Sequence, residues 1–209
     1  MGTKPARTLI LVPIIHSPAD MGTLAPSVRR VTVQKIGQQG WERNVDVIRQ
    51  MWADISQAVE GWELPWATVR LYQDGLPRCG RESEIVKELA GAGSPNHQIL
   101  LKLMHKGATL MGTESPDLLL QEYRLVKHLL AMEHPEAAAK AGTKQSARSR
   151  SLLARRDRDI AECINTSLRP SETGILFLGM LHSVEPHLAR DIHVTHPIRQ
   201  LQRARRQRV

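Results

Sequence analysis

Residues 8–16 have the sequence Thr8-Leu-Ile-Leu-Val-Pro-Ile-Ile-His16, and residues 174–182 have the sequence Gly174-Ile-Leu-Phe-Leu-Gly-Met-Leu-His182. Each is a short apolar run that ends in a histidine, and such a run is typical of a strand buried in a parallel sheet. Further strands are predicted at residues 67–73, 108–112 and 191–195. Because helical segments separate these runs, the sequence predicts an α/β fold: one domain with a mostly parallel central sheet flanked by helices.

The helical segments are recognised from apolar residues at helical spacing and from start and stop signals. Ser94-Pro95 and Ser115-Pro116-Asp117 are each typical of a helix start, and Leu119, Tyr123, Val126 and Leu130 form the predicted apolar stripe of the second helix. Residues 133–149 show no apolar period, so we expect a flexible connection there. The helix that starts at Pro95 is predicted to end at residue 106, and the remaining helices are predicted at residues 44–60, 82–90 and 150–168.

Length and composition predict a single domain over residues 1–198. The chain has 209 residues, of which 41% are hydrophobic, and this is enough for a full core without disulfides. Cys79 and Cys163 form no metal-binding or disulfide pattern and are expected to be reduced. No run approaches the ~20 apolar residues of a membrane-spanning helix, and the first apolar run is too short for a signal peptide. We therefore expect a cytoplasmic protein with no membrane partner.

The formal net charge of +8 is concentrated in two segments. Residues 140–158 contain seven Lys and Arg and one acidic residue, and the predicted C-terminal tail, residues 199–209, contains five Arg and no acidic residue. Without these twelve basic residues and one acidic residue, the totals of 29 basic and 21 acidic residues fall to 17 basic and 20 acidic residues in the rest of the chain. The rest of the chain is therefore slightly acidic. Neither segment interleaves aromatic residues with its arginines, so nucleic acid is a secondary hypothesis for the partner.

Four predicted strands end in a polar residue that can carry chemistry: His16, Asp74, Glu114 and His182. Because ligands of open parallel sheets bind beyond the carboxyl ends of the strands, these side chains are candidates for one shared site. His16, Glu114 and His182 would together make a two-histidine, one-carboxylate set for a divalent metal ion. Without a metal, one histidine would act as a general base oriented by a carboxylate. The structural alternative is that each residue only satisfies backbone groups, and Asp74-Gly is also ordinary turn chemistry.

Arg156 and Asp157 fall on or beside the predicted inner stripe of the helix over residues 150–168, which contains Leu153 and Ile160. Charged residues at such positions should have partners. One interpretation is a partly buried structural ion pair. The other is an arginine that positions an anionic group of a ligand while Asp157 holds the arginine in place.

Four short elements of the chain, in sequence order, are Leu11-Val-Pro-Ile-Ile-His16, Gly112-Thr-Glu114-Ser-Pro116, Arg156-Asp157-Arg158-Asp159-Ile160-Ala161 and Gly179-Met-Leu-His182. In this order they resemble motifs of the TraB/Tiki proteins, which belong to a group with the ChaN-like and erythromycin-esterase-like proteins. The resemblance covers about residues 8–195. Two positions depart from the family pattern: Pro13 replaces the glycine of a Gly-x-x-His motif, and Arg155 replaces an acidic residue.

The resemblance implies a metal-dependent hydrolase that acts on a small or peptide-like substrate. By motif, His16, Glu114 and His182 would be metal-binding or catalytic residues, and Arg156 and Asp157 would support them. The alternative hypothesis is a non-enzymatic module that binds an anionic ligand, such as a nucleotide or nucleic acid, through Arg156 and the basic segments. It rests on the local charge excess and on the absence of a catalytic signature with fixed spacing.

Overall fold

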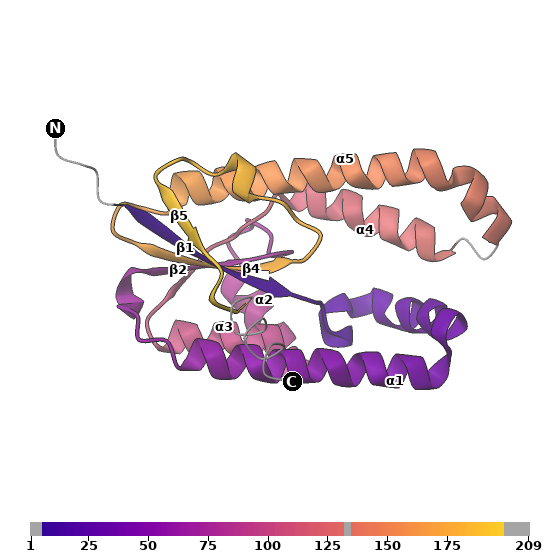
Figure 1. Cartoon of the computed structure of the whole chain (residues 1–209), viewed down its shortest axis with the longest axis horizontal. Helices are drawn as coiled ribbons and strands as arrows, with labels where there is room; N and C mark the ends of the chain where they lie inside the picture. Colours follow the sequence, from indigo (N-terminus) through magenta and orange to yellow (C-terminus); the bar gives the residue numbers. More distant parts are fainter. Residues whose placement is uncertain (1–5, 132–134, 199–209) are drawn as a thin grey trace, which may run out of the picture.

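The computed structural model describes residues 6–131 and 135–198 of the chain (Figure 1). Five parallel strands form one sheet in the order β3-β2-β4-β1-β5, which confirms the predicted α/β fold. In chain order the elements are β1 (Arg7–Ile14), the 3-10 helix η1 (Pro18–Leu24), α1 (Ala25–Glu60), η2 (Trp66–Thr68), β2 (Val69–Gln73), α2 (Glu82–Gly91), α3 (Pro95–His105), β3 (Thr109–Leu110), α4 (Pro116–Ala131), α5 (Pro135–Ser167), β4 (Thr173–Gly179), η3 (Glu185–His187) and β5 (Ile192–Thr195).

One face of the sheet packs on α1, α2 and α3. Alternate residues of β1 and β4 point to this side, because successive side chains of a strand lie on opposite faces. They include Val12 and Phe177, which join Trp52 and Ile55 of α1 and Leu100 of α3 in one buried cluster. The indole Nε1 of Trp52 also donates a hydrogen bond of 3.1 Å to the carbonyl of Ile15, so α1 holds the end of β1 in place.

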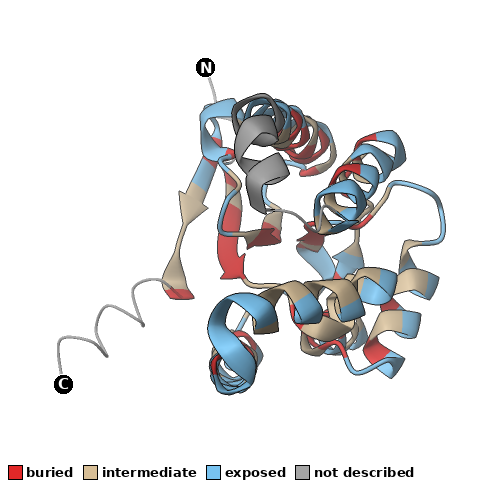
Figure 2. Ribbon diagram, turned by 90° about the vertical axis from the view of Figure 1, so that its right-hand side faces the viewer, coloured by how far each residue is buried: buried red, intermediate tan, exposed pale blue. Residues whose placement is uncertain are grey.

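The opposite face of the sheet packs on the C-terminal half of α5. Leu9 and Leu176 point to this side and contact Ile160 and Ile164, all of them almost fully buried. Figure 2 shows the buried residues on the strands and on the helix faces that are turned toward them. The two layers together leave the carboxyl ends of the strands at one edge, from which α4, α5 and the start of α1 extend further (Figure 1).

The structure corrects three expectations about the helices. α1 starts at Ala25 rather than near residue 44, with a kink at Gly37, whose φ is +75°. α5 is helical from Pro135, where an irregular connection was predicted over residues 133–149. Both added segments extend beyond the sheet (Figure 1). The segment of α5 is rich in helix-forming residues but lacks the apolar period of a helix that packs on a sheet. On α4 the buried stripe contains Leu118 and Leu125, whereas Tyr123 is exposed.

The described residues bear on several other expectations. Ser94 caps α3 by accepting a hydrogen bond of 3.2 Å from the backbone N–H of His97, as predicted. Cys79 and Cys163 are both free thiols. Over residues 6–131 and 135–198, no helix combines the length and apolar character needed to cross a membrane. The arginine-rich segment 199–209 and residues 132–134 lie outside the described residues.

Candidate functional site

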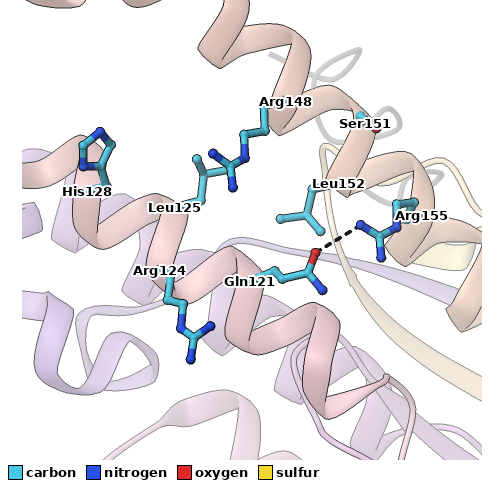
Figure 3. A pocket seen from close by; sticks show the side chains of 8 residues that line it. All are labelled: Gln121, Arg124, Leu125, His128, Arg148, Ser151, Leu152 and Arg155. Atoms are coloured by element: carbon cyan, nitrogen blue, oxygen red, sulfur yellow. Dashed lines mark hydrogen bonds between the residues drawn. The ribbon is translucent and has the colours of Figure 1, made fainter.

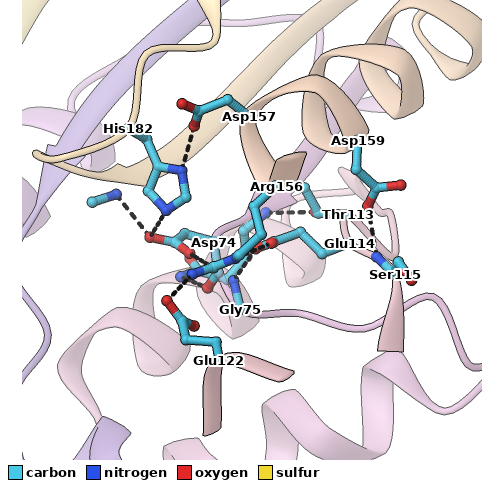
Figure 4. A network of polar contacts seen from close by, with 12 residues as sticks. Asp74, Gly75, Thr113, Glu114, Ser115, Glu122, Arg156, Asp157, Asp159 and His182 are labelled. Atoms are coloured by element: carbon cyan, nitrogen blue, oxygen red, sulfur yellow. Dashed lines mark hydrogen bonds and ion pairs between the residues drawn. The ribbon is translucent and has the colours of Figure 1, made fainter. Parts of the chain in front are cut away.

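The six residues that the sequence analysis singled out meet at the carboxyl edge of the sheet. Figure 4 shows five of them, all except His16. They come from the ends of β1, β2 and β4, from the segment after β3 and from α5. We call this group the strand-end site. It consists of His16, Asp74, Glu114, Arg156, Asp157 and His182.

Asp74 is at the centre of the strand-end site. Its Oδ1 accepts a hydrogen bond of 2.7 Å from Arg156, and its Oδ2 accepts one of 3.0 Å from the backbone N–H of Gly179. The Nε2 atoms of His16 and of His182 each lie 3.5 Å from the same Oδ2. Burial alone would raise the pKa of Asp74, but its contacts with the two histidines hold that pKa well below the usual value. Asp74 is therefore a carboxylate that both histidines face.

Gly179 explains how β4 can approach Asp74 so closely. A Cβ atom added at Gly179 would lie 2.7 Å from Asp74 Oδ2, which is closer than real Cβ contacts come. Glycine at this position therefore lets the backbone N–H reach the carboxylate. His182 follows in the turn after β4, where its backbone N–H donates to the carbonyl of Gly179 at 3.1 Å.

His182 is buried and held on both sides by carboxylates. Its Nδ1 lies 2.6 Å from Asp157 Oδ1, and 4% of its side chain is exposed. Burial lowers the pKa of His182, but the hydrogen bonds with Asp157 and Asp74 outweigh this effect and raise the pKa to about 9. Asp157 thus fixes the orientation of the imidazole ring and directs Nε2 toward Asp74.

His16 is the member of the two-histidine pair that faces solvent, with 40% of its side chain exposed. Burial lowers its pKa, whereas the contact with Asp74 raises it, and the net result is a raised pKa. The loop after His16 is anchored by Asp20, which accepts hydrogen bonds from the Ser17 backbone at 2.6 Å and from the Ser94 hydroxyl. His16 is therefore open to a ligand while its backbone is fixed to α3.

Arg156 is buried, with 3% of the residue exposed, and its guanidinium binds three carboxylates. Nε donates to Glu114 Oε2 at 2.6 Å, Nη2 donates to Glu114 Oε1 at 3.0 Å and to Asp74 Oδ1 at 2.7 Å, and Nη1 donates to Glu122. These hydrogen bonds all go to carboxylates of the chain itself, and contact of Arg156 with an anionic ligand stays a prediction. The structure contradicts the expectation that Asp157 holds Arg156, because Asp157 pairs with His182 instead. The alternative interpretation, a buried structural ion pair, describes Arg156 better, with other partners.

Glu114 is fully buried and turned toward Arg156. Besides the arginine, its Oε1 accepts a hydrogen bond of 2.7 Å from the backbone N–H of Gly75, so the carboxylate also fixes the turn that follows β2. Burial and the nearby charge of Asp74 raise the pKa of Glu114, Arg156 and the Gly75 N–H lower it, and the net result is a raised pKa. The carboxylate that the two histidines share is thus Asp74, whereas Glu114 binds the arginine behind it.

Two residues of this region were not predicted. Glu122 binds Arg156 from α4, and its spacing of four residues from Leu118 and three from Leu125 places it on the buried face of the helix. This helical spacing is the sequence signal by which Glu122 could have been identified. Asp159 accepts a hydrogen bond of 2.7 Å from the backbone N–H of Ser115 and pairs with Arg78 at 2.7 Å, which fixes the segment around Glu114.

Imidazole nitrogens and a carboxylate are the donors that zinc and related divalent ions prefer. In the part of the chain that the structure describes, no group of three or more His, Cys, Asp or Glu side chains is already arranged to hold a metal ion.

Comparisons of the chain with protein-family models, with curated proteins and with solved structures found no match.

Proposed function

We propose that the strand-end site is the active site of a metal-dependent hydrolase that acts on a small or peptide-like substrate. The observation that carries the proposal is the convergence of the His16 and His182 Nε2 atoms, each 3.5 Å from Asp74 Oδ2. This separation exceeds that of a good hydrogen bond. It is close to the spacing of roughly 3.4 Å between two tetrahedral ligands that are each about 2.1 Å from one ion.

His16, Asp74 and His182 would hold the divalent ion. Asp157 supports this assignment, because a carboxylate bonded to Nδ1 of a histidine leaves Nε2 for an ion, as in many metal sites. Asp74 replaces Glu114 in the set predicted from the sequence, because both oxygens of Glu114 are bonded to Arg156. The more exposed His16 side chain has room to adjust as an ion binds.

An ion held there would lower the pKa of a bound water molecule and polarise a carbonyl or phosphoryl oxygen. The chain's own residues supply the rest. Arg156 fixes Asp74 through a hydrogen bond to Oδ1, and Asp157 keeps His182 in one orientation. His16 stands between the buried carboxylates and the solvent side where a substrate would enter.

Ion binding can be tested without knowing the substrate. Protein stripped with a chelator should bind one Zn²⁺, Co²⁺ or Mn²⁺ ion per chain by elemental analysis after dialysis. An ion at one hundred times its Kd stabilises the folded state by about 2.7 kcal/mol, which raises Tm by about 5 to 10 °C in a chain of this size. His16→Ala and His182→Ala should abolish both effects.

The matched control is His193→Ala, which alters an exposed histidine on β5. It should behave as the unmodified protein. If no ion binds and Tm does not respond, the metal site is refuted. If an ion binds but the loaded protein cleaves no ester, amide or phosphoester in a substrate panel, the hydrolase is refuted and the metal site stands.

A further inference from the structure

A second polar site lies between α4 and the middle of α5 (Figure 3). It is a pocket of about 350 Å³, a size typical of sites for small molecules. None of the residues that line it belongs to the strand-end site. Its lining residues are Gln121, Arg124, Leu125, His128, Arg148, Ser151, Leu152 and Arg155.

The lining of this pocket is strongly basic. Arg124, Arg148 and Arg155 are all exposed, and His128 lies one turn after Arg124 on α4. Arg155 donates a hydrogen bond of 3.0 Å to Gln121, a neutral partner that leaves the charge of the guanidinium uncompensated. The described residues that line the pocket include no Asp or Glu. Three arginines on two helices therefore line one pocket whose described lining has no acidic side chain.

Between these charges the pocket is apolar. Leu125 of α4 and Leu152 of α5 are mostly buried and pack together with Leu118. Figure 3 shows both side chains between the two helices, with the Arg148 guanidinium reaching from α5 toward Leu125. The pocket thus offers an apolar contact next to cationic groups, as a ligand with an anionic group and an apolar part requires.

Neighbouring residues on both helices separate this pocket from the strand-end site. On α5, Arg155 faces the pocket, whereas Arg156 binds the buried carboxylates. On α4, Gln121 faces Arg155, whereas Glu122 binds Arg156. A change in the pocket can therefore be made without touching the strand-end site.

We propose that the α4–α5 pocket binds a small organic phosphate ester. Phosphate suits it better than a single carboxylate, because a phosphate dianion carries more charge and accepts hydrogen bonds from several guanidinium groups. The ester group of the ligand would lie on Leu125 and Leu152. A nucleic-acid strand fits less well, because the lining contains no aromatic side chain on which a base could stack.

The test uses phenyl phosphate as the probe and follows its ³¹P NMR signal during titration with the full-length protein at physiological salt. A chelator is present, so that a metal ion at the strand-end site cannot capture the phosphate. We expect saturable binding with a Kd of about 1 mM or tighter. Inorganic phosphate should bind more weakly because it lacks the apolar part, and phenol should not bind.

Arg124→Gln and Arg148→Gln should each weaken phenyl phosphate binding by about tenfold, because each removes a charge-assisted hydrogen bond. Both side chains are exposed, so the variants should keep the Tm of the unmodified protein. The matched control is Arg150→Gln, an exposed arginine of α5 outside the pocket, which should change the affinity less than twofold.

Three results would overturn the proposal. The first is the absence of saturable binding at a phenyl phosphate concentration about ten times the expected Kd. The second is a loss of affinity in Arg150→Gln that equals the loss in the two pocket variants. The third is binding of a short single-stranded oligonucleotide through Arg124 and Arg148 without binding of phenyl phosphate. The last result would assign the pocket to nucleic acid.

Discussion

Replacing Arg156 with alanine would leave three carboxylates without the cation that they share. Asp74 and Glu114 are buried, whereas Glu122 is 40% exposed and can turn to water. Removing one partner of a buried ion pair costs about 3 to 5 kcal/mol, because the remaining charge is uncompensated. We expect Arg156→Ala to lower the free energy of unfolding by this amount at pH 7, which corresponds to a fall in Tm of about 6 to 20 °C.

Two further measurements characterise the effect. Arg156→Lys restores a charge but cannot bind two carboxylates with a planar fork, so its loss should fall between that of alanine and zero. Without the arginine, the pKa of Glu114, which is already raised in the folded protein, should rise further above its value in the unfolded chain. The stability lost by Arg156→Ala should therefore shrink as the pH falls from 7 toward 5, since the folded variant then takes up protons.

Urea unfolding followed by tryptophan fluorescence is a suitable assay, because Trp52 is buried in the core. Arg158→Ala is the matched control, since Arg158 is an exposed arginine two residues further along the same helix, and it should change the free energy of unfolding by less than about 0.5 kcal/mol. A loss below about 1 kcal/mol for Arg156→Ala, or one equal to that of the control, would refute the view that this guanidinium balances the buried charge.

Three more predictions concern the strand-end site and the loop that holds it. In metal-free protein the imidazole of His182 should titrate near pH 9 by NMR, and Asp157→Asn should lower that pKa toward 6.5. Because folding raises the pKa of His182, the stabilisation that this protonated imidazole contributes is complete below pH 6.5 and is lost as the pH rises toward 9. A His182 titration near pH 6.5 in the unmodified protein would contradict this prediction. Gly179→Ala should abolish the rise of Tm with divalent ions, because the added Cβ would collide with Asp74 Oδ2. The control is Gly91→Ala, where an added Cβ meets nothing within 4 Å, and it should leave this rise intact. Equal behaviour of the two variants would count against the close approach of β4 to Asp74. Ser94→Ala should lower the free energy of unfolding by about 1 to 2 kcal/mol in urea, because α3 loses its cap, and an unchanged midpoint would show that the cap contributes nothing.

The sequence predicted the sheet and the location of the site because both depend on local patterns. Apolar runs marked β1 and β4, and a parallel sheet brings the carboxyl ends of its strands to one edge whatever their order. His16, Asp74, Glu114 and His182 could therefore be placed together without knowing which strands are neighbours. The strand order β3-β2-β4-β1-β5 depends on long-range pairing and had no local signal.

The pairing of side chains within the site could not be predicted. Arg156 and Asp157 are adjacent in the sequence, so an ion pair between them was a natural expectation. Successive residues of a helix point about 100° apart, and this rotation sends the arginine to Asp74 and Glu114 but sends the aspartate to His182. Such a difference depends on how α5 is rotated on the sheet.

The start of α5 is a helix that the sequence pattern did not predict. Residues 135–149 form a helix without the apolar stripe that marks a helix packed on a sheet, because this part of α5 extends beyond the strands (Figure 1). Its Ala, Lys, Gln and Arg residues favour helix through intrinsic propensity alone, a weaker signal than periodicity.

The place of β1 in the sheet has a consequence for the synthesis of the protein. β1 is made before the other four strands of the described sheet, yet its partners are β4 (Thr173–Gly179) and β5 (Ile192–Thr195), the last two of these five strands to be made. At about 5 to 20 residues per second, translation leaves this apolar strand unpaired for many seconds. The nascent chain thus exposes an aggregation-prone segment until β4 and β5 have been synthesised, and only then can the sheet that brings His16 to Asp74 form.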